Sequence, residues 1–552
     1  MSSLFSRRQQ FASAALMTFF VGHSLFGFTK TGTNYTTDGS QPDVMAALAN
    51  ANPGDTVHLP AGTFTWGTGF VAVNLNNAVN LIGAGETQTI INLDSTGPNG
   101  VYGAIQIFAP AIVGYFKING SASNDVNPFA IGATSGWRIT HITYDGNGGG
   151  GHDAGYFAFI SGSTGLIDSC TIIGGGGTAE LIFARGPTDA WQTADSAGTA
   201  NAIYVEDCMF SGVGYVSDFN SNSRAVVRNC TIAANMKIDG HGFDSNGPPR
   251  SFREIEAYRN IWTNGGAEAF DIRGGTGFLF DNKVTNTDPT SAWFILESYG
   301  VESYWQNYGV MISSATATMP CTITTVTPHG LQSGWGPVQV VVSNPAGSSL
   351  AAIIASTYTV TVTGPNTFTI PFNPGVAGNY GYVTAEQTPF NYPLPDQIGV
   401  GQDPKAAHSD PMYLWNNTAA GGVDWALTWK AVDADAIALY KTQTSNPAAT
   451  FTMQDIVAAD RDYFKQTVGG TFNGSSGVGR GTKAQMNAIT PTKTGVGFWV
   501  TDEGNWDTTL PANTSGQFYV WNGTAWVLKY TPYIYPHPLR RPIAPSSLQI
   551  GP

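Results

Sequence analysis

The feature that most constrains this chain is a short apolar segment that recurs along its first half. In each copy, β-branched or aromatic residues alternate with polar ones, and a polar residue precedes a small or apolar one. Six copies share the pattern: Trp137–Thr143, Leu166–Ile172, Tyr204–Phe210, Val226–Ile232, Ala257–Trp262 and Leu279–Val284. Alternation over such short runs is typical of β-strands. The repeat therefore predicts a solenoid, in which each unit buries its apolar side chains only against its neighbours.

The spacing of the copies predicts the size of one coil. The copies align on six residues: Ile142, Cys170, Cys208, Cys230, Ile261 and Lys283. The gaps between these residues are 28, 38, 22, 31 and 22. A gap of 22 fits one coil of three short strands, and the longer gaps fit coils that carry loops. A polar residue precedes the aligned position in four copies, at Asp207, Asn229, Asn260 and Asn282. This resembles the polar ladder that parallel β-helix proteins place at a turn.

Four cysteines in 552 residues are too few for a disulfide framework, and no Cys/His spacing of a metal site occurs. The aligned Cys170, Cys208 and Cys230 are interpreted as small apolar core residues. A disulfide between Cys208 and Cys230, on adjacent coils, remains the alternative.

The charge of the chain excludes one class of partner. Charged residues make up 11% of the sequence, against about 25% in typical soluble domains. The net charge of −13 argues against a nucleic-acid partner, because Lys and Arg drive binding to phosphate backbones. It is compatible with a calcium site built from carboxylates, but does not demand a cofactor.

The first 28 residues are predicted to be a signal peptide or an N-terminal anchor. Arg7 and Arg8 precede a mostly apolar run, Phe11–Phe28. A charged segment followed by an apolar one is typical of export signals. We therefore expect a secreted or cell-surface protein.

The residues after this leader predict how the solenoid begins. Asp38 or Ser40 could cap a short helix whose apolar face holds Val44, Ala47 and Leu48. The strands expected next are Thr56–Pro60, Val79–Ile82 and Thr89–Asn92, with a Gly83-Ala84-Gly85 turn between the last two. This order resembles the start of right-handed parallel β-helix proteins of the pectate-lyase-like superfamily. The resemblance implies an all-β solenoid whose open end is covered by the helix, and a polysaccharide partner bound in a groove along one face.

The pattern divides the chain into further parts. The β-helix is expected over residues 33–313, and alternating strands predict an inserted small antiparallel β-module over 314–388. His329 of that module is interpreted as a turn residue. Resumed β-helix rungs are expected over 389–462, and an aromatic-rich C-terminal cap over 463–552. A sugar-stacking surface is the alternative interpretation of these aromatic residues.

The candidate site is the densest polar cluster, between Asp239 and Arg273. Its candidate catalytic residues are Asp239, His241, Asp244, Arg253 and Arg273. The candidate substrate-binding residues are Arg224, Arg250, Glu256, Glu268 and Asp271. If one coil is about 22 residues, Arg253 and Arg273 would stack on neighbouring rungs and neutralise an acidic sugar.

Two reactions fit these residue types. A polysaccharide lyase needs a cation to stabilise the enolate-like charge and a base, roles suited to Arg253 or Arg273 and His241. A glycoside hydrolase needs paired carboxylates. Gly240-His241-Gly242 resembles the Gly-His-Gly of polygalacturonase-type hydrolases, and Asp271-Ile272-Arg273 resembles their downstream Arg-Ile-Lys, but the upstream Asp pair of that family is missing. The lyase is therefore the favoured enzyme.

A non-catalytic role is the alternative from a different class. An adhesin or a spike- or fibre-like protein would use the solenoid as a rigid rod, as a homo-oligomer or in a surface assembly. In that case the polar residues at coil turns would pair with one another. Clustering of His241, Arg253 and Arg273 in one groove would favour the enzyme.

Overall fold

The computed structural model describes residues 27–67, 72–93, 103–120, 127–146, 156–175, 180–186, 196–242, 251–263, 268–285, 294–296, 309–343, 352–384, 397–403 and 406–540, less short gaps within 196–242, 309–343 and 406–540. Residues 1–26 of the predicted leader therefore lie outside the described residues. In the part of the chain that is described, no helix is long and apolar enough to cross a membrane.

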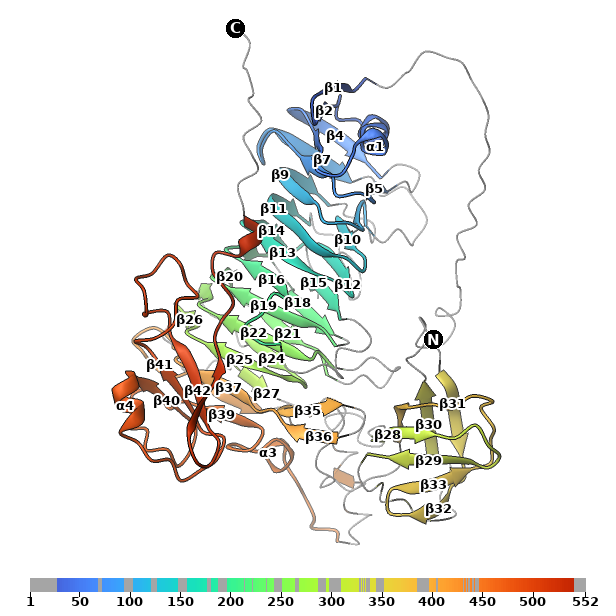
Figure 1. The fold of residues 1–552 in the computed structure, drawn as a ribbon, viewed down its shortest axis with the longest axis vertical. Helices are drawn as coiled ribbons and strands as arrows, with labels where there is room; N and C mark the ends of the chain where they lie inside the picture. The colour runs from blue at the N-terminus through green and yellow to red at the C-terminus, as the bar shows by residue number, and fades with distance from the viewer. Residues whose placement is uncertain are drawn as a thin grey trace.

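The body of the molecule is a solenoid of short parallel strands that stack rung on rung (Figure 1). Each complete rung contributes one strand to each of three sheets. The first sheet contains β2 (Asn34–Thr36), β3 (Thr56–His58), β6 (Asn80–Ile82), β9 (Ile112–Asn119), β11 (Ser135–Asp145), β13 (Thr164–Asp168), β16 (Ile203–Glu206), β19 (Arg224–Arg228), β22 (Glu254–Tyr258), β25 (Thr276–Phe280), β37 (Met412–Trp415) and β39 (Tyr463–Lys465). The parallel β-helix fold predicted from the repeat is thus confirmed.

The long strands β9 and β11 continue from the first sheet into the second. The other strands of the second sheet are β4 (Gly62–Trp66), β7 (Thr89–Leu93), β14 (Thr171–Ile173), β17 (Met209–Ser211), β20 (Thr231–Ala233), β23 (Ile261–Thr263) and β26 (Lys283–Val284). The third sheet contains β5 (Val73–Leu75), β8 (Ile105–Ile107), β10 (Phe129–Ile131), β12 (Ala158–Ser161), β15 (Glu180–Arg185), β18 (Tyr215–Asn220), β21 (Lys237–Gly240), β24 (Phe270–Ile272), β27 (Phe294–Leu296) and β38 (Leu427–Trp429).

The N-terminal end begins as the sequence predicts. A short antiparallel pair, β1 (Thr29–Thr31) with β2, precedes helix α1 (Gln41–Asn50). Val44, Ala47 and Leu48 of α1 are buried in the solenoid core. Ser40 is the N-cap residue, but its side chain accepts no capping hydrogen bond.

A column of left-handed residues makes the tight turn between the first and second sheets. His141, Ser169, Asp207, Asn229, Arg259, Asp281 and Asn416 have φ between 49° and 57°. Asn and Asp adopt this conformation most readily among residues with a Cβ. Four of the seven positions hold Asn or Asp, which explains the polar residue that recurs in the sequence pattern.

The residue after each left-handed turn points into the core, and here the predicted alignment was wrong by one residue on two rungs. Ile261 pairs with Thr231, and Lys283 pairs with Ile261. The interior column is therefore Ile142, Cys170, Cys208, Cys230, Asn260 and Asn282. The last two form a buried ladder with Asn417, since each amide donates to the next at 3.0 and 2.8 Å. Asp207 and Asn229 belong to the turn column instead. All three aligned cysteines are free and buried.

The connection from β27 to β37 carries a separate module. It is a seven-stranded antiparallel sheet of β28 (Gly309–Ala315), β29 (Cys321–Thr325), β30 (Val338–Ser343), β31 (Ala352–Tyr358), β32 (Thr361–Gly364), β33 (Thr367–Ile370) and β34 (Tyr380–Thr384). A hairpin of β35 (Val400–Asp403) and β36 (Ala406–Ser409) follows it. His329 is 2% exposed and bonds to backbone atoms of Gly364 and Leu331, as expected of a turn residue.

The C-terminal part folds back on the solenoid. Helix α3 (Met453–Ile456) precedes β39, the last strand of the first sheet. Beyond it, β40 (Val478–Gly481), helix α4 (Lys483–Asn487), β41 (Gly497–Val500), β42 (Gln517–Trp521) and β43 (Trp526–Tyr530) form a small four-stranded sheet domain. The chain then runs back along the solenoid toward the rungs of β13 and β14, ending in the short helix η4 (Pro538–Arg540) (Figure 1).

Candidate functional site

The outer surface of the first sheet is covered by the C-terminal part of the chain. Outward-facing apolar side chains of successive rungs include Tyr204, Tyr258, Phe280 and Trp415. They form one buried cluster with Trp499, Trp506, Phe518 and Tyr530 of the small sheet domain and the segment beside it. Trp415 stacks on Phe280 with ring centroids 4.3 Å apart. The central aromatic residues of the tail are therefore buried against the first sheet, and not over the end of the last rung.

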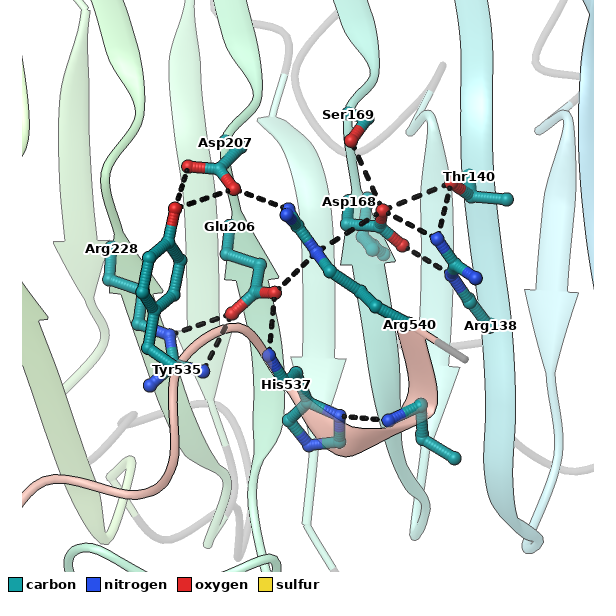
Figure 2. Close-up of polar contacts among 12 residues, drawn as sticks. Arg138, Thr140, Asp168, Ser169, Glu206, Asp207, Arg228, Tyr535, His537 and Arg540 are labelled. Atoms are coloured by element: carbon teal, nitrogen blue, oxygen red, sulfur yellow. Dashed lines mark hydrogen bonds and ion pairs between the residues drawn. The ribbon is translucent and has the colours of Figure 1, made fainter. Parts of the chain in front are cut away.

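The segment 531–540, here called the strap, closes a buried ionic network on the same face (Figure 2). The Arg228 guanidinium lies 2.6 Å from the Glu206 carboxylate, and both side chains are 0% exposed. Arg540 reaches Glu206 at 2.6 Å and Asp207 at 2.5 Å. Arg138 binds Asp168 at 2.7 Å. Cations and carboxylates thus alternate along this face and neutralise one another.

Two predicted site residues, Arg253 and Glu256, lie at the first sheet and are bonded to other parts of the protein. Arg253 is 1% exposed and pairs with Asp410 at 2.9 Å. Glu256 accepts hydrogen bonds from the Gly198 backbone N–H and from the Tyr530 hydroxyl, both in segments that cover the sheet. The expected stacking of Arg253 with Arg273 is wrong, because Arg253 precedes a strand of the first sheet and Arg273 follows a strand of the third. Arg224 lies beside Glu254 on adjacent strands of the first sheet.

The third sheet carries a different outward column. Asp218, Asp239 and Asp271 occupy the same position on β18, β21 and β24, since Asp218 pairs with Asp239 and Asp239 with Asp271. We call these three residues the acidic ladder. Neighbouring strands lie about 4.8 Å apart, so the ladder brings like charges close together. Its members are 4%, 3% and 2% exposed.

Two cations compensate part of this charge. Lys237 Nζ lies 2.6 Å from an Asp271 carboxylate oxygen and 2.8 Å from a Glu268 oxygen. The Arg273 guanidinium pairs with Asp239. Asp218 has no such close cation among the described residues, apart from the His241 ring, whose Nδ1 lies 3.6 Å from Asp218 Oδ1.

The pKa values of Asp218 and Asp239 are pushed upward. Burial raises the pKa of Asp218 well above its usual range, and the carboxylates of Glu180 and Asp239 raise it further. Burial also raises the pKa of Asp239, to about 6, because it outweighs the effect of Arg273. Carboxyl groups that hold a proton near neutral pH can act as general acids, and neighbours that lose theirs can act as bases.

The structure therefore brings together Asp239, His241, Glu268, Asp271 and Arg273 of the predicted site. It places Arg224, Arg253 and Glu256 on the first sheet instead. Asp244 and Arg250 lie outside the described residues.

The sequence analysis missed Asp218, Glu180 and Lys237. An available signal was the repetition of Asp beside apolar or small residues once per rung, in Ser217-Asp218-Phe219, Ile238-Asp239-Gly240 and Phe270-Asp271-Ile272. Within the described residues, no group of three or more His, Cys, Asp or Glu side chains is placed to hold a metal ion.

In the comparisons with known proteins, the chain matches solved structures but neither a family model nor a curated protein. An alginate lyase from Paenibacillus matches with a TM-score of 0.33 and 14% identity, over 48% of this chain and 90% of that chain. The A-module of a mannuronan C-5 epimerase from Azotobacter vinelandii matches with a TM-score of 0.27 and 15% identity, over 50% and 86%.

A third solved structure is WceF of Pantoea stewartii, described as a glycan biofilm modifying enzyme with a tailspike-like parallel β-helix fold. It matches with a TM-score of 0.32 and 11% identity, over 67% of this chain and 63% of that chain.

Proposed function

We propose that this protein cleaves an extracellular polysaccharide at the acidic ladder, by general acid–base hydrolysis of a glycosidic bond. The observation that carries the proposal is the in-register stacking of Asp218, Asp239 and Asp271 with raised pKa values at the first two. Asp168 and Glu206 on the first sheet each pair with a guanidinium, whereas Asp218 forms no ion pair with a guanidinium among the described residues, although the charges of Arg273 and Arg185 act on it. The resemblance to pectate-lyase-like β-helix proteins supplies the substrate class.

The two carboxyl groups with raised pKa values take different roles. Asp218 is the general acid, because it keeps its proton to the higher pH and can protonate the leaving oxygen. Asp239, whose charged form Arg273 stabilises in part, is the base or nucleophile once it ionises above about pH 6. The two groups lie on adjacent rungs and titrate as a pair.

A lyase reaction is the second candidate, and His241 is the observation that favours it. Its ring faces Asp218, so an Asp–His pair could abstract the proton beside a uronate carboxylate. The lyase was favoured from the sequence alone. It becomes second here because Lys237 and Arg273, the cations in contact with the acidic ladder, are already paired with carboxylates.

One assay separates these functions. The secreted form is incubated with acidic and neutral polysaccharides, with and without calcium, while reducing ends and unsaturated products are followed. Reducing ends lost in Asp218→Asn and Asp239→Asn, and kept in the surface control Asp424→Asn, support hydrolysis. Unsaturated product lost in His241→Ala supports the lyase. No product across the panel, from a folded protein, favours the adhesin or fibre-like role.

We further propose that the protein is exported. The charged and apolar segment of residues 1–28 supports this. Fractionation of the native host into cytoplasm, envelope and medium tests it, because a protein confined to the cytoplasm is incompatible with an extracellular substrate.

A further inference from the structure

Arg185 lies next to the acidic ladder, on the neighbouring rung of the third sheet. It ends strand β15, which pairs with β18 so that Phe183 lies beside Asp218 and Arg185 beside Asn220. On the other side, Phe183 lies beside Phe159 of β12. The outward column thus changes from two aromatic rings to three carboxylates.

The aromatic rings hold the guanidinium in place. Phe159 and Phe183 stack with ring centroids 5.2 Å apart and planes 9° from parallel. The Arg185 guanidinium carbon lies 5.0 Å from the Phe183 centroid and 6.0 Å from that of Phe159. Tyr156 packs against both rings, with its centroid 4.9 Å from that of Phe183 and 6.0 Å from that of Phe159. A cation over aromatic faces is attracted by their quadrupoles and loses much of its freedom.

Arg185 differs from Lys237 and Arg273, the other cations of this face, because it forms no ion pair with a described carboxylate. Lys237 and Arg273 each contact a carboxylate. Across the described ranges, Arg185 makes neither an ion pair nor a side-chain hydrogen bond, although its charge lowers the pKa of Asp218, and its Nε is buried without a hydrogen-bond partner. A buried donor without a partner costs free energy, and a charged donor costs more. A bound anion would supply the missing acceptor.

We propose that Arg185, on the platform of Phe159 and Phe183, is a subsite for the anionic group of a sugar, so that the substrate is an acidic polysaccharide. The planar guanidinium suits a carboxylate or a sulfate. A chain of net charge −13 repels a polyanion overall, so recognition of one depends on a local cation such as this. The inference rests on the proposed function, because it concerns the same face and places the anionic sugar about one or two strand spacings, roughly 5–10 Å, from the acidic ladder.

The experiment measures binding separately from cleavage. Isothermal calorimetry compares polygalacturonate with its fully methyl-esterified form, which keeps the backbone and loses the charge, and with chondroitin sulfate. The proteins are the wild type, Arg185→Gln, Arg185→Lys and Arg480→Gln. Arg480 is an exposed arginine of the small sheet domain and serves as the matched control. Circular dichroism checks that each variant is folded.

We expect Arg185→Gln to weaken binding of an acidic polymer roughly 10- to 100-fold, as loss of a charge-assisted contact predicts. Binding of the esterified polymer stays unchanged, Arg185→Lys lies between, and Arg480→Gln behaves as the wild type. Preference for polygalacturonate identifies a carboxylate as the anion, and preference for chondroitin sulfate identifies a sulfate.

Three outcomes would overturn the subsite. They are an unchanged affinity in Arg185→Gln, an equal loss for charged and esterified polymers, and no binding of any acidic polymer by the wild type. If Arg185→Gln weakens binding of charged and esterified polymers equally and also shifts the pH profile of cleavage, Arg185 acts through Asp218 and not on the substrate. Binding that depends on Arg185 without any product would contradict the proposed hydrolysis and leave the subsite standing.

Discussion

The first and third sheets are built from the same rungs, yet their outer faces have opposite character. On the first sheet, Arg138, Asp168, Glu206 and Arg228 form ion pairs, and Arg540 of the strap adds a further cation. On the third sheet, three carboxylates stack on one another. Like charges on neighbouring strands destabilise a sheet. The ion pairs stabilise the first face, whereas the third face retains an unfavourable stacking of carboxylates, which the proposed hydrolysis would use.

The largest expected effect is on the covered face. Deletion of residues 466–552 would expose the outward aromatic column of the first sheet, including Tyr258, Phe280 and Trp415. Each such side chain contributes about 1.5–3 kcal/mol when buried, and their sum approaches the whole stability of a typical domain, about 5–15 kcal/mol. We expect an insoluble protein, measured as soluble yield and light scattering.

The matched control removes only the strap. Deletion of residues 531–552 keeps the small sheet domain, so we expect a soluble protein with a lower melting temperature. Equal solubility of the two truncated chains and the wild type would show that the aromatic cluster contributes little.

On the third sheet, Asp239→Asn should abolish the base of the proposed reaction. General acid–base groups contribute about 10²- to 10⁴-fold to rate, so kcat should fall by that factor. The measurement is release of reducing ends by protein whose circular dichroism matches the wild type. Asp207→Asn, which removes a carboxylate paired with the strap, should leave kcat unchanged. If it lowers kcat as much as Asp239→Asn does, the two faces do not differ in function as proposed.

Breaking the closed network should cost stability instead of activity. Glu206→Gln leaves Arg228, which is 0% exposed, without its carboxylate. Loss of one partner of a buried pair costs about 3–5 kcal/mol. Chemical denaturation would measure this loss, and the double variant Glu206→Leu with Arg228→Met should recover part of it. A change below about 1 kcal/mol, typical of an exposed pair, would contradict the burial of this network.

The two faces should respond to pH with opposite signs. Burial and the charges of Arg228 and Arg540 lower the pKa of His537 to about 3. A lowered folded pKa gives stability that is present above the ordinary value near 6.5 and is lost as the pH falls, about 2 kcal/mol by pH 5. The pKa of Asp239 is raised to about 6, so its contribution is present below about pH 4 and is lost as the pH rises through 6.

Unfolding free energies measured from pH 4 to 8 test both signs. His537→Asn should flatten the loss on the acid side, and Asp239→Asn should flatten the loss between pH 4 and 6. Cleavage should also fall below about pH 6, as Asp239 becomes protonated. An unaltered pH dependence in either variant would rule out the titration assigned to that residue.

The sequence by itself determined the solenoid. Strand alternation and the apolar face of helix α1 are local patterns and are present at the expected residues, whereas the recurrent Asn or Asp lies at the turn at Asp207 and Asn229 but in the core at Asn260 and Asn282. The spacing of the repeats alone did not predict the register between neighbouring rungs. The shift at Ile261 and Lys283 is one residue, and a shift of one residue moves a side chain from the core to the outer surface.

The tertiary structure decided which polar residues meet. Arg228 donates to the carbonyl oxygens of Tyr533 and Ile534, more than 300 positions later in the chain, and no local pattern encodes that contact. The fold likewise separates Arg253 from Arg273 and places Asp218 beside Asp239. The physical reason is that loops of variable length join the rungs, so distance along the chain does not give the rung or the face on which a side chain lies.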